Sequence, residues 1–96
     1  MTFESFSDSL KASDAPALLS VYMKALWHDK KGHWDKAHEL IQEVEDVNAA
    51  WIHAYLHRKE GDIWNADYWY HRAKQERPVC SLEEEWENLC RSLLSL

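Results

Sequence analysis

The sequence predicts an all-α domain of about five main helices. Apolar side chains recur at helical spacing, and no run shows the two-residue alternation of a β-strand. Only two glycines and two prolines occur among the 96 residues, which leaves few positions for the tight turns of a hairpin-rich β fold. With 46% hydrophobic and 29% charged residues, the chain has the composition of one small domain.

The first helices are placed by their start and stop signals. Residues 1–13 form an arm or a short helix that docks through Phe3, Phe6 and Leu10. Asp14 as cap and Pro16 in the first turn predict a long helix over about 15–30, which ends at Gly32. Its expected apolar residues are Leu18, Val21, Tyr22, Ala25 and Leu26.

Two further helices follow by the same reasoning. A helix over about 33–46 carries one apolar stripe of Trp34, Ala37, Leu40, Ile41 and Val44. Asn48 is the expected cap of a helix over about 49–60, which ends at Gly61.

The last two helices complete the domain of residues 14–96. Asp62 is the expected cap of a helix over about 63–76, because Pro78 prevents continuation. The main stripe of that helix is Ile63, Ala66, Trp69, Tyr70 and Ala73. The run Ser81-Leu-Glu-Glu84 has the spacing of a capping box and predicts a helix over 82–94.

An internal repeat relates residues that are 29 positions apart. His28 and His57, Gly32 and Gly61, and Ala37 and Ala66 share this offset with five further pairs. The pattern of Gly, Ala and large apolar residues before Pro78 resembles the tetratricopeptide repeat, although the period is shorter than the roughly 34 residues of that family. The run 50–70 also resembles a group of short uncharacterised bacterial proteins.

The tetratricopeptide resemblance implies two stacked helical hairpins, over 15–46 and 48–77, closed by a capping helix over 82–94. It also implies a concave groove that binds a peptide or protein segment. The residues mapped to that groove are Asn48, Trp51, Tyr55, Arg58, Lys59, Tyr22, Leu26, Asp29 and Lys30. The alternative is that Trp51 and Tyr55 pack against the N-terminal arm while Arg58 pairs with a surface carboxylate.

The histidines suggest a second kind of site. His53 and His57 lie four residues apart on one helix face, and His28 occupies the repeat position equivalent to His57. Together with His71 they could line an aromatic pocket or hold a divalent transition metal. We expect these imidazoles to be packing residues instead, and therefore no cofactor, because one histidine pair lacks the three or four ligands of a zinc site.

A second aromatic face on the helix over 63–76 carries Trp64, Tyr68 and His71. We expect the last helix to cover it. The alternatives are a second subunit, which would make the protein a homodimer, or a ligand pocket shared with Trp27 and His57.

Charge and motif searches limit the remaining function classes. The net charge of −6 without a basic cluster argues against nucleic acid as partner. The first residues lack the pattern of a signal peptide, and no apolar run approaches the length of a membrane span. Cys80 and Cys90 form no redox motif. We therefore expect a cytoplasmic protein with reduced thiols. Phosphate loops and nucleophile elbows are absent and no catalytic residue is identified. The sequence therefore favours a non-enzymatic interaction module, with a metal- or ligand-binding enzyme as the alternative.

Overall fold

The computed structural model describes all 96 residues and contains six α-helices and no β-strand. The helices are α1 Phe3–Ser9, α2 Val21–Lys30, α3 Trp34–Gln42, α4 Val47–Lys59, α5 Ile63–Arg72 and α6 Leu82–Leu93. The all-α prediction is confirmed, and of the two forms expected for the N-terminal segment the short helix is the one observed. None of the six helices combines the length and the apolar character that a bilayer crossing requires.

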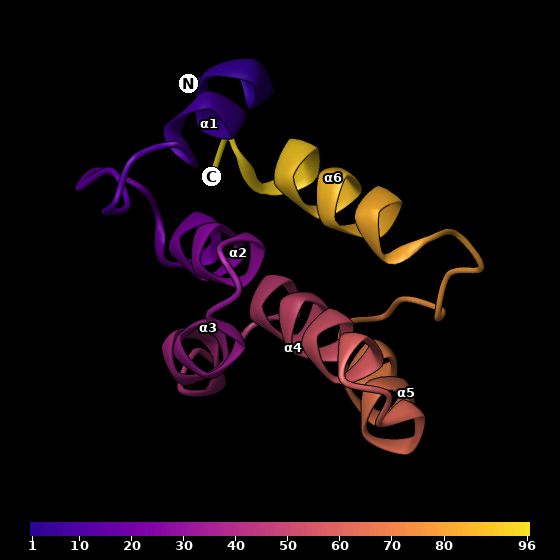
Figure 1. The fold of residues 1–96 in the computed structure, drawn as a ribbon. Coiled ribbons are helices and arrows are strands. Elements are labelled where there is room, and N and C mark those ends of the chain that lie inside the picture. Colours follow the sequence, from indigo (N-terminus) through magenta and orange to yellow (C-terminus); the bar gives the residue numbers. More distant parts are fainter.

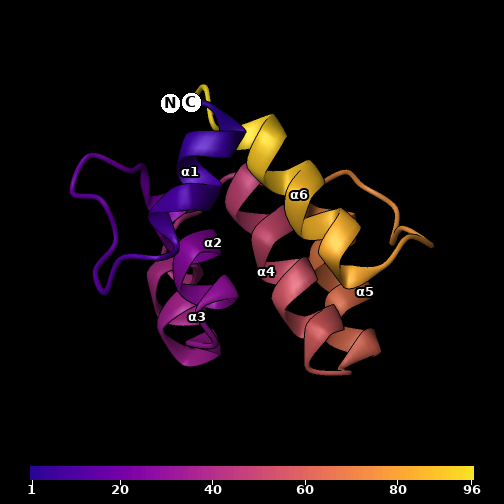
Figure 2. The ribbon, with the colours of Figure 1, turned by 45° about the horizontal axis from the view of Figure 1, so that its top comes forward.

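The helices are arranged in three layers (Figure 1). The helices α2 and α4 form the middle layer, with α3 and α5 on one side and α1 and α6 on the other. In sequence order α2 packs against α3, and α4 packs against α5, so the chain contains two helical hairpins. Figure 2 shows α1 and α6 beside each other, and the two chain ends close together.

Each hairpin turns at a glycine in the left-handed region. The backbone φ angle is 87° at Gly32 and 88° at Gly61, a conformation that favours glycine. The amide of His33 donates to the His28 carbonyl at 2.8 Å, and the amide of Asp62 donates to the His57 carbonyl at 2.9 Å. This is the Schellman pattern of helix termination, and both glycine stops predicted from the sequence are confirmed.

The first long helix starts later than the predicted residue 15. Ser20, not Asp14, caps α2, because its hydroxyl accepts the Met23 amide at 3.2 Å. Residues 10–20 form a connection instead, and the side chain of Leu18 is fully exposed rather than buried. The Lys31 ammonium holds this connection by donating to the carbonyls of Leu10 and Ala12 at 2.7 and 3.0 Å.

Three other predicted boundaries also shift. The helix α3 ends at Gln42 rather than 46, and α4 begins at Val47 because the Asp46 carboxylate accepts the Ala49 amide at 2.8 Å. Asn48, the predicted cap, therefore lies inside α4. The helix α5 ends at Arg72 rather than 76, and Lys74 adopts a φ of 59° just beyond it. The predicted caps Asp62 and Ser81 are confirmed.

The core lies between the middle layer and its neighbours. Phe6, Trp27 and Leu26 are fully buried, and the Trp86 indole donates to the Leu26 carbonyl at 3.0 Å. The small residues Ala37 and Ala66 are completely buried, as the repeat predicted. The main cluster joins α1, α2, α3, α4 and α6, and it consists of Phe6, Met23, Ala25, Leu26, Trp27, Ala37, Ile41, Ala49, Ile52, Tyr55, Leu56, Trp86, Leu89, Cys90 and Leu93.

Candidate functional site

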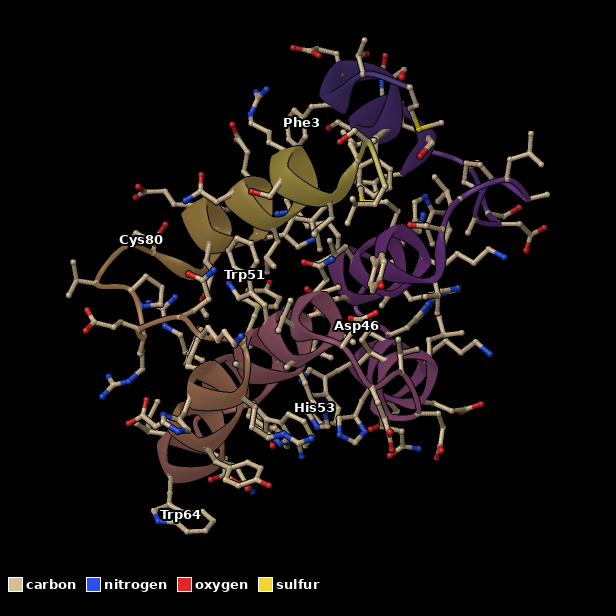
Figure 3. All side chains as sticks on the ribbon, turned by 180° about the vertical axis from the view of Figure 1, so that it is seen from behind. Phe3, Asp46, Trp51, His53, Trp64 and Cys80 are labelled. Atoms are coloured by element: carbon tan, nitrogen blue, oxygen red, sulfur yellow. The ribbon has the colours of Figure 1, made fainter.

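The face of α4 that the sequence assigned to a partner lies under α6. In Figure 3 the labelled Trp51 sits between α4 and α6. Its indole nitrogen donates to Glu85 of α6 at 3.3 Å, and the Arg58 guanidinium contacts the same carboxylate at 2.8 Å. The C-terminal helix of the chain therefore occupies the position that the resemblance left open for a peptide.

Glu85 is a buried carboxylate that joins three helices. The Tyr70 hydroxyl donates its one hydrogen to this carboxylate and lies 2.7 and 2.6 Å from the two oxygens, in addition to the contacts from Trp51 and Arg58. Burial and the Glu85 hydrogen bond raise the pKa of Tyr70. Burial lowers the pKa of Arg58, but the hydrogen bond and the charge of Glu85 outweigh it, and the net shift is upward. The charge of Glu85 is thus compensated inside the protein.

Asp29 forms a second buried carboxylate centre, in the first hairpin. Its exposed fraction is 1%, and it accepts the Tyr55 hydroxyl and the Lys59 ammonium, each at 2.9 Å. Burial, followed by the charge of Asp29, raises the pKa of Tyr55. These contacts tie α2 to α4.

Six of the nine residues mapped to the groove thus have hydrogen-bond partners within the chain. Besides those around Glu85 and Asp29, the Tyr22 hydroxyl donates to the Asp46 carboxylate at the start of α4. Of the other three, Leu26 is completely buried in the core, Lys30 lies 3.8 Å from Glu83, and Asn48 is half-buried in the first turn of α4. The two cavities of the molecule lie elsewhere.

The opposite side of α4 carries a cluster of imidazoles, which we call the histidine cluster: His38 of α3 with His53 and His57 of α4. The Nε2 atoms of His38 and His53 are 3.0 Å apart. The ring centroids of His53 and His57 are 4.9 Å apart, and those of His38 and His57 are 5.5 Å apart. One nitrogen from each of the three rings lies within 4.8 Å of the others, so the three could ligate one ion.

Tryptophans support this cluster from both sides. Trp34 stacks on His38 with the ring centroids 5.0 Å apart, and Trp69 stacks on His53 at 3.9 Å. The Arg72 guanidinium lies over the Trp69 ring, 4.8 Å from the ring centroid. The imidazoles are therefore held between rigid aromatic rings.

Burial favours the neutral form of two of the three imidazoles. It lowers the pKa of His53 to about 3, with further contributions from His38, His57 and Arg72. Burial, followed by the charge of His57, also lowers the pKa of His38. Neutral imidazole retains the nitrogen lone pair that hydrogen bonding or metal binding requires.

The structure separates the four histidines that the sequence grouped. His53 and His57 belong to the cluster, but His28 lies against Trp27 and near His33, and His71 is exposed on α5. Sequence reasoning missed His38. The sequence feature that could have identified His38 is its position four residues after Trp34, which places both rings on the same side of α3.

The outer face of α5, defined by Trp64, Tyr68 and His71, is open. The exposed fractions of Trp64 and Tyr68 are 79% and 50%, and Trp64 projects away from the molecule in Figure 3. The prediction that the last helix covers this face is wrong, because α6 lies on α2 and α4 instead. Trp69, expected in the core, is half-buried between this face and the histidine cluster.

Two cavities and two thiols are the other features that could form a site. A cavity of about 290 Å³ lies where α3, α4 and α5 meet and includes Asp46, Trp69 and Arg72 in its wall; a more apolar one of about 340 Å³ lies near the chain ends. Both cysteines are free, and burial raises the pKa of the Cys90 thiol, which makes it unreactive.

Comparisons of this chain with protein-family models, with curated proteins and with solved structures gave no significant match.

Proposed function

We propose that the chain is a small non-enzymatic interaction module, and that the outer face of α5 is its contact surface. The observation that carries this proposal is the exposure of Trp64 and Tyr68, four residues apart on one helix and covered by no other element. Exposed aromatic patches on small proteins mark interaction sites, and Trp and Tyr dominate the binding energy of interfaces.

Tyr68, one of the aromatic residues of this face, is held in place by its own helix. The Arg72 guanidinium lies 5.8 Å from the Tyr68 ring centroid and 4.8 Å from that of Trp69, and its Nη1 is 3.4 Å from the Tyr68 hydroxyl. Side chains that are already ordered lose less entropy when a partner binds.

The charge distribution favours a second copy of this chain as the partner. Residues 62–77 contain three acidic side chains, Asp62, Asp67 and Glu76, and three basic ones, Arg72, Lys74 and Arg77, so 3 − 3 leaves no net charge there. The formal charge of −6 lies entirely on the rest of the molecule. Two copies can therefore approach through α5 with little repulsion, and a twofold contact pairs the face with itself.

The tetratricopeptide-like identity is part of the same proposal. Two helical hairpins with glycine turns 29 residues apart and buried alanines at equivalent positions support it. Since α6 fills the face opposite α5, we assign binding to α5 and not to the groove that the resemblance implies. Two free thiols fit the reducing conditions of the cytoplasm.

Sedimentation of the untagged protein over a range of concentrations tests the proposal. We expect the wild type to dimerise and the double variant Trp64→Ser/Tyr68→Ser to stay monomeric. The matched control is Leu18→Ser, because Leu18 is apolar and fully exposed but lies near the chain ends, beside the second cavity and not on α5.

A wild type that stays monomeric up to about 1 mM refutes self-association. Recognition of a segment of another protein is then examined by selecting peptides from a display library on the wild type. If the selected peptides bind the double variant equally well, the assignment to α5 is wrong.

A further inference from the structure

The histidine cluster has the donor set of a transition-metal site. His38, His53 and His57 present three imidazole nitrogens within 4.8 Å of one another. Imidazole is a preferred ligand of Zn²⁺, Ni²⁺ and Cu²⁺, and three histidines with an open fourth position form a common zinc site. The donors come from two helices that pack against each other, so folding alone brings them together.

The spacing of one nitrogen pair, that of His38 and His53, is close to the spacing of two ligands around a shared ion. With Zn–N distances of about 2.0–2.1 Å and tetrahedral angles, two ligand nitrogens lie roughly 3.4 Å apart. The Nε2 atoms of His38 and His53 are 3.0 Å apart, so an ion between them requires a shift of a few tenths of an ångström. One of these two rings carries the hydrogen of this contact on its Nε2 atom. When an ion binds, that hydrogen moves to the Nδ1 atom of the same ring, and the Nε2 lone pairs of both rings then face the ion.

A carboxylate already orients the third ring. The Nδ1 atom of His57 is 2.7 Å from an Oε1 atom of Glu60, which fixes a proton on Nδ1 and leaves Nε2 with its lone pair. A carboxylate on the far nitrogen of a histidine is the usual outer support of a metal ligand. Trp34 and Trp69, stacked on the other two rings, limit their rotation.

We propose that His38, His53 and His57 bind one first-row divalent ion, with Zn²⁺ as the representative, and that Glu60 positions His57. The Arg72 guanidinium, whose charge acts on His53, lies over the Trp69 ring, while the carboxylates of Glu60 and Asp35 act in the opposite sense on His38. This site is separate from the α5 contact surface and does not depend on the function proposed above.

His57, Glu60 and Asp62 form a second group that meets the same distance limit. We do not propose a metal site there. Both oxygens of the Asp62 carboxylate are hydrogen-bonded to Asn65, where Asp62 caps α5. The acidic members of this group are also more exposed than the three imidazoles.

Titration of the untagged, chelator-treated protein with Co²⁺ tests the site. We expect one equivalent to bind, with the visible absorption of a low-coordinate Co²⁺ centre, and Zn²⁺ to displace it. His38→Gln and His57→Gln should abolish stoichiometric binding, and Glu60→Gln should weaken it about 10-fold. His71→Gln is the matched control and should bind as the wild type does, because His71 is exposed outside the cluster.

Nitrogen-detected NMR of the wild type supplies a test that needs no variant. Zn²⁺ should shift the imidazole nitrogens of His38, His53 and His57 and leave those of His33 and His71 unmoved. The proposal is overturned if no ion binds more tightly than about 1 mM, if the double variant His38→Gln/His57→Gln still binds, or if the shifted nitrogens belong to other histidines.

Discussion

The two helical hairpins follow one plan with different chemistry at equivalent positions. Both end their first helix with the same glycine turn, and both begin their second helix after a residue of similar backbone geometry, His33 with φ −102° and ψ 65° and Asp62 with φ −89° and ψ 77°. Yet the buried Asp29 of the first hairpin corresponds to the half-buried Arg58 of the second, so the charge at this repeat position changes sign. A repeat can therefore keep its backbone while each copy finds its own partners.

The largest expected effect comes from removing these two charges. Arg58→Ala leaves the Glu85 carboxylate, with an exposed fraction of 1%, without its cation, and we expect a loss of about 3–5 kcal/mol in the free energy of unfolding. Asp29→Ala should cost less, because the released Lys59 ammonium is about one-third exposed and can turn to water. Urea unfolding measures both. Equal losses, or losses no larger than that of the exposed control Asp35→Ala, would contradict the roles assigned to the two charges.

Overpacking at the equivalent alanines should give the next largest effect. Ala37 and Ala66 are completely buried, so Ala37→Leu and Ala66→Leu should each destabilise the protein by about 1–3 kcal/mol. Thermal unfolding is the measurement, and Ala17→Leu, at an exposed position outside the helices, is the control. A variant that melts like the parent would mean that the helix contact at that alanine is looser than its complete burial indicates.

Exchanging the caps should have a smaller effect. The Asp62 side chain accepts the Asn65 amide, whereas His33 makes no side-chain cap bond. His33→Asp should therefore stabilise the protein by about 1 kcal/mol, because the same backbone geometry brings the new carboxylate to the Lys36 amide. Asp62→Ala should destabilise it. If His33→Asp unfolds at the same urea concentration as the wild type, the N-terminal ends of α3 and α5 are less alike than their backbone angles indicate.

The smallest expected effect is on the pH dependence of stability. It concerns His28 and His57, which occupy equivalent positions of the repeat. His57 contacts Glu60, but the buried Nδ1 of His28 has no partner, and burial, followed by the charges of His33 and Lys36, lowers the pKa of His28. The unfolded chain then binds more protons than the folded protein just below pH 6.5. His28 alone therefore lowers stability as the pH drops through this range by less than about 1.4 kcal/mol per pH unit, in addition to the contributions of His38 and His53.

His28→Phe should flatten this dependence, and the exposed control His71→Phe should leave it unchanged. Urea unfolding of the three proteins between pH 7 and pH 5 measures the slopes. A steeper slope in His28→Phe would show that His28 gains a proton on folding, which is the opposite of the effect that its burial predicts.

Local signals predicted the all-α class and the helix turns, and tertiary contacts decided the rest. Gly32, Gly61 and Ser81 act on their own backbone neighbours, so the sequence alone was enough to place them. The start of α2 was mistaken because Asp14 and Ser20 are both good caps, and the choice between them depends on how the helix packs.

The candidate site was harder to predict because it depends on which helices meet. Spacing within α4 joined His53 to His57, but His38 arrives from α3, 15 residues before His53. The α4 face with Trp51 and Arg58 has the composition of a binding surface, and the sequence does not encode locally that α6 lies on it. Glu85 is one of three acidic residues in the first turn of α6, and nothing in the sequence marks it as the one that is buried.

The way Glu85 joins α4, α5 and α6 bears on how the molecule opens. A carboxylate that holds Trp51, Arg58 and Tyr70 at once cannot release one helix without stranding polar groups on the others. The C-terminal helix should therefore not fray independently. In native-state hydrogen exchange its amides should report the same opening event as those of the second hairpin, as one cooperative unit.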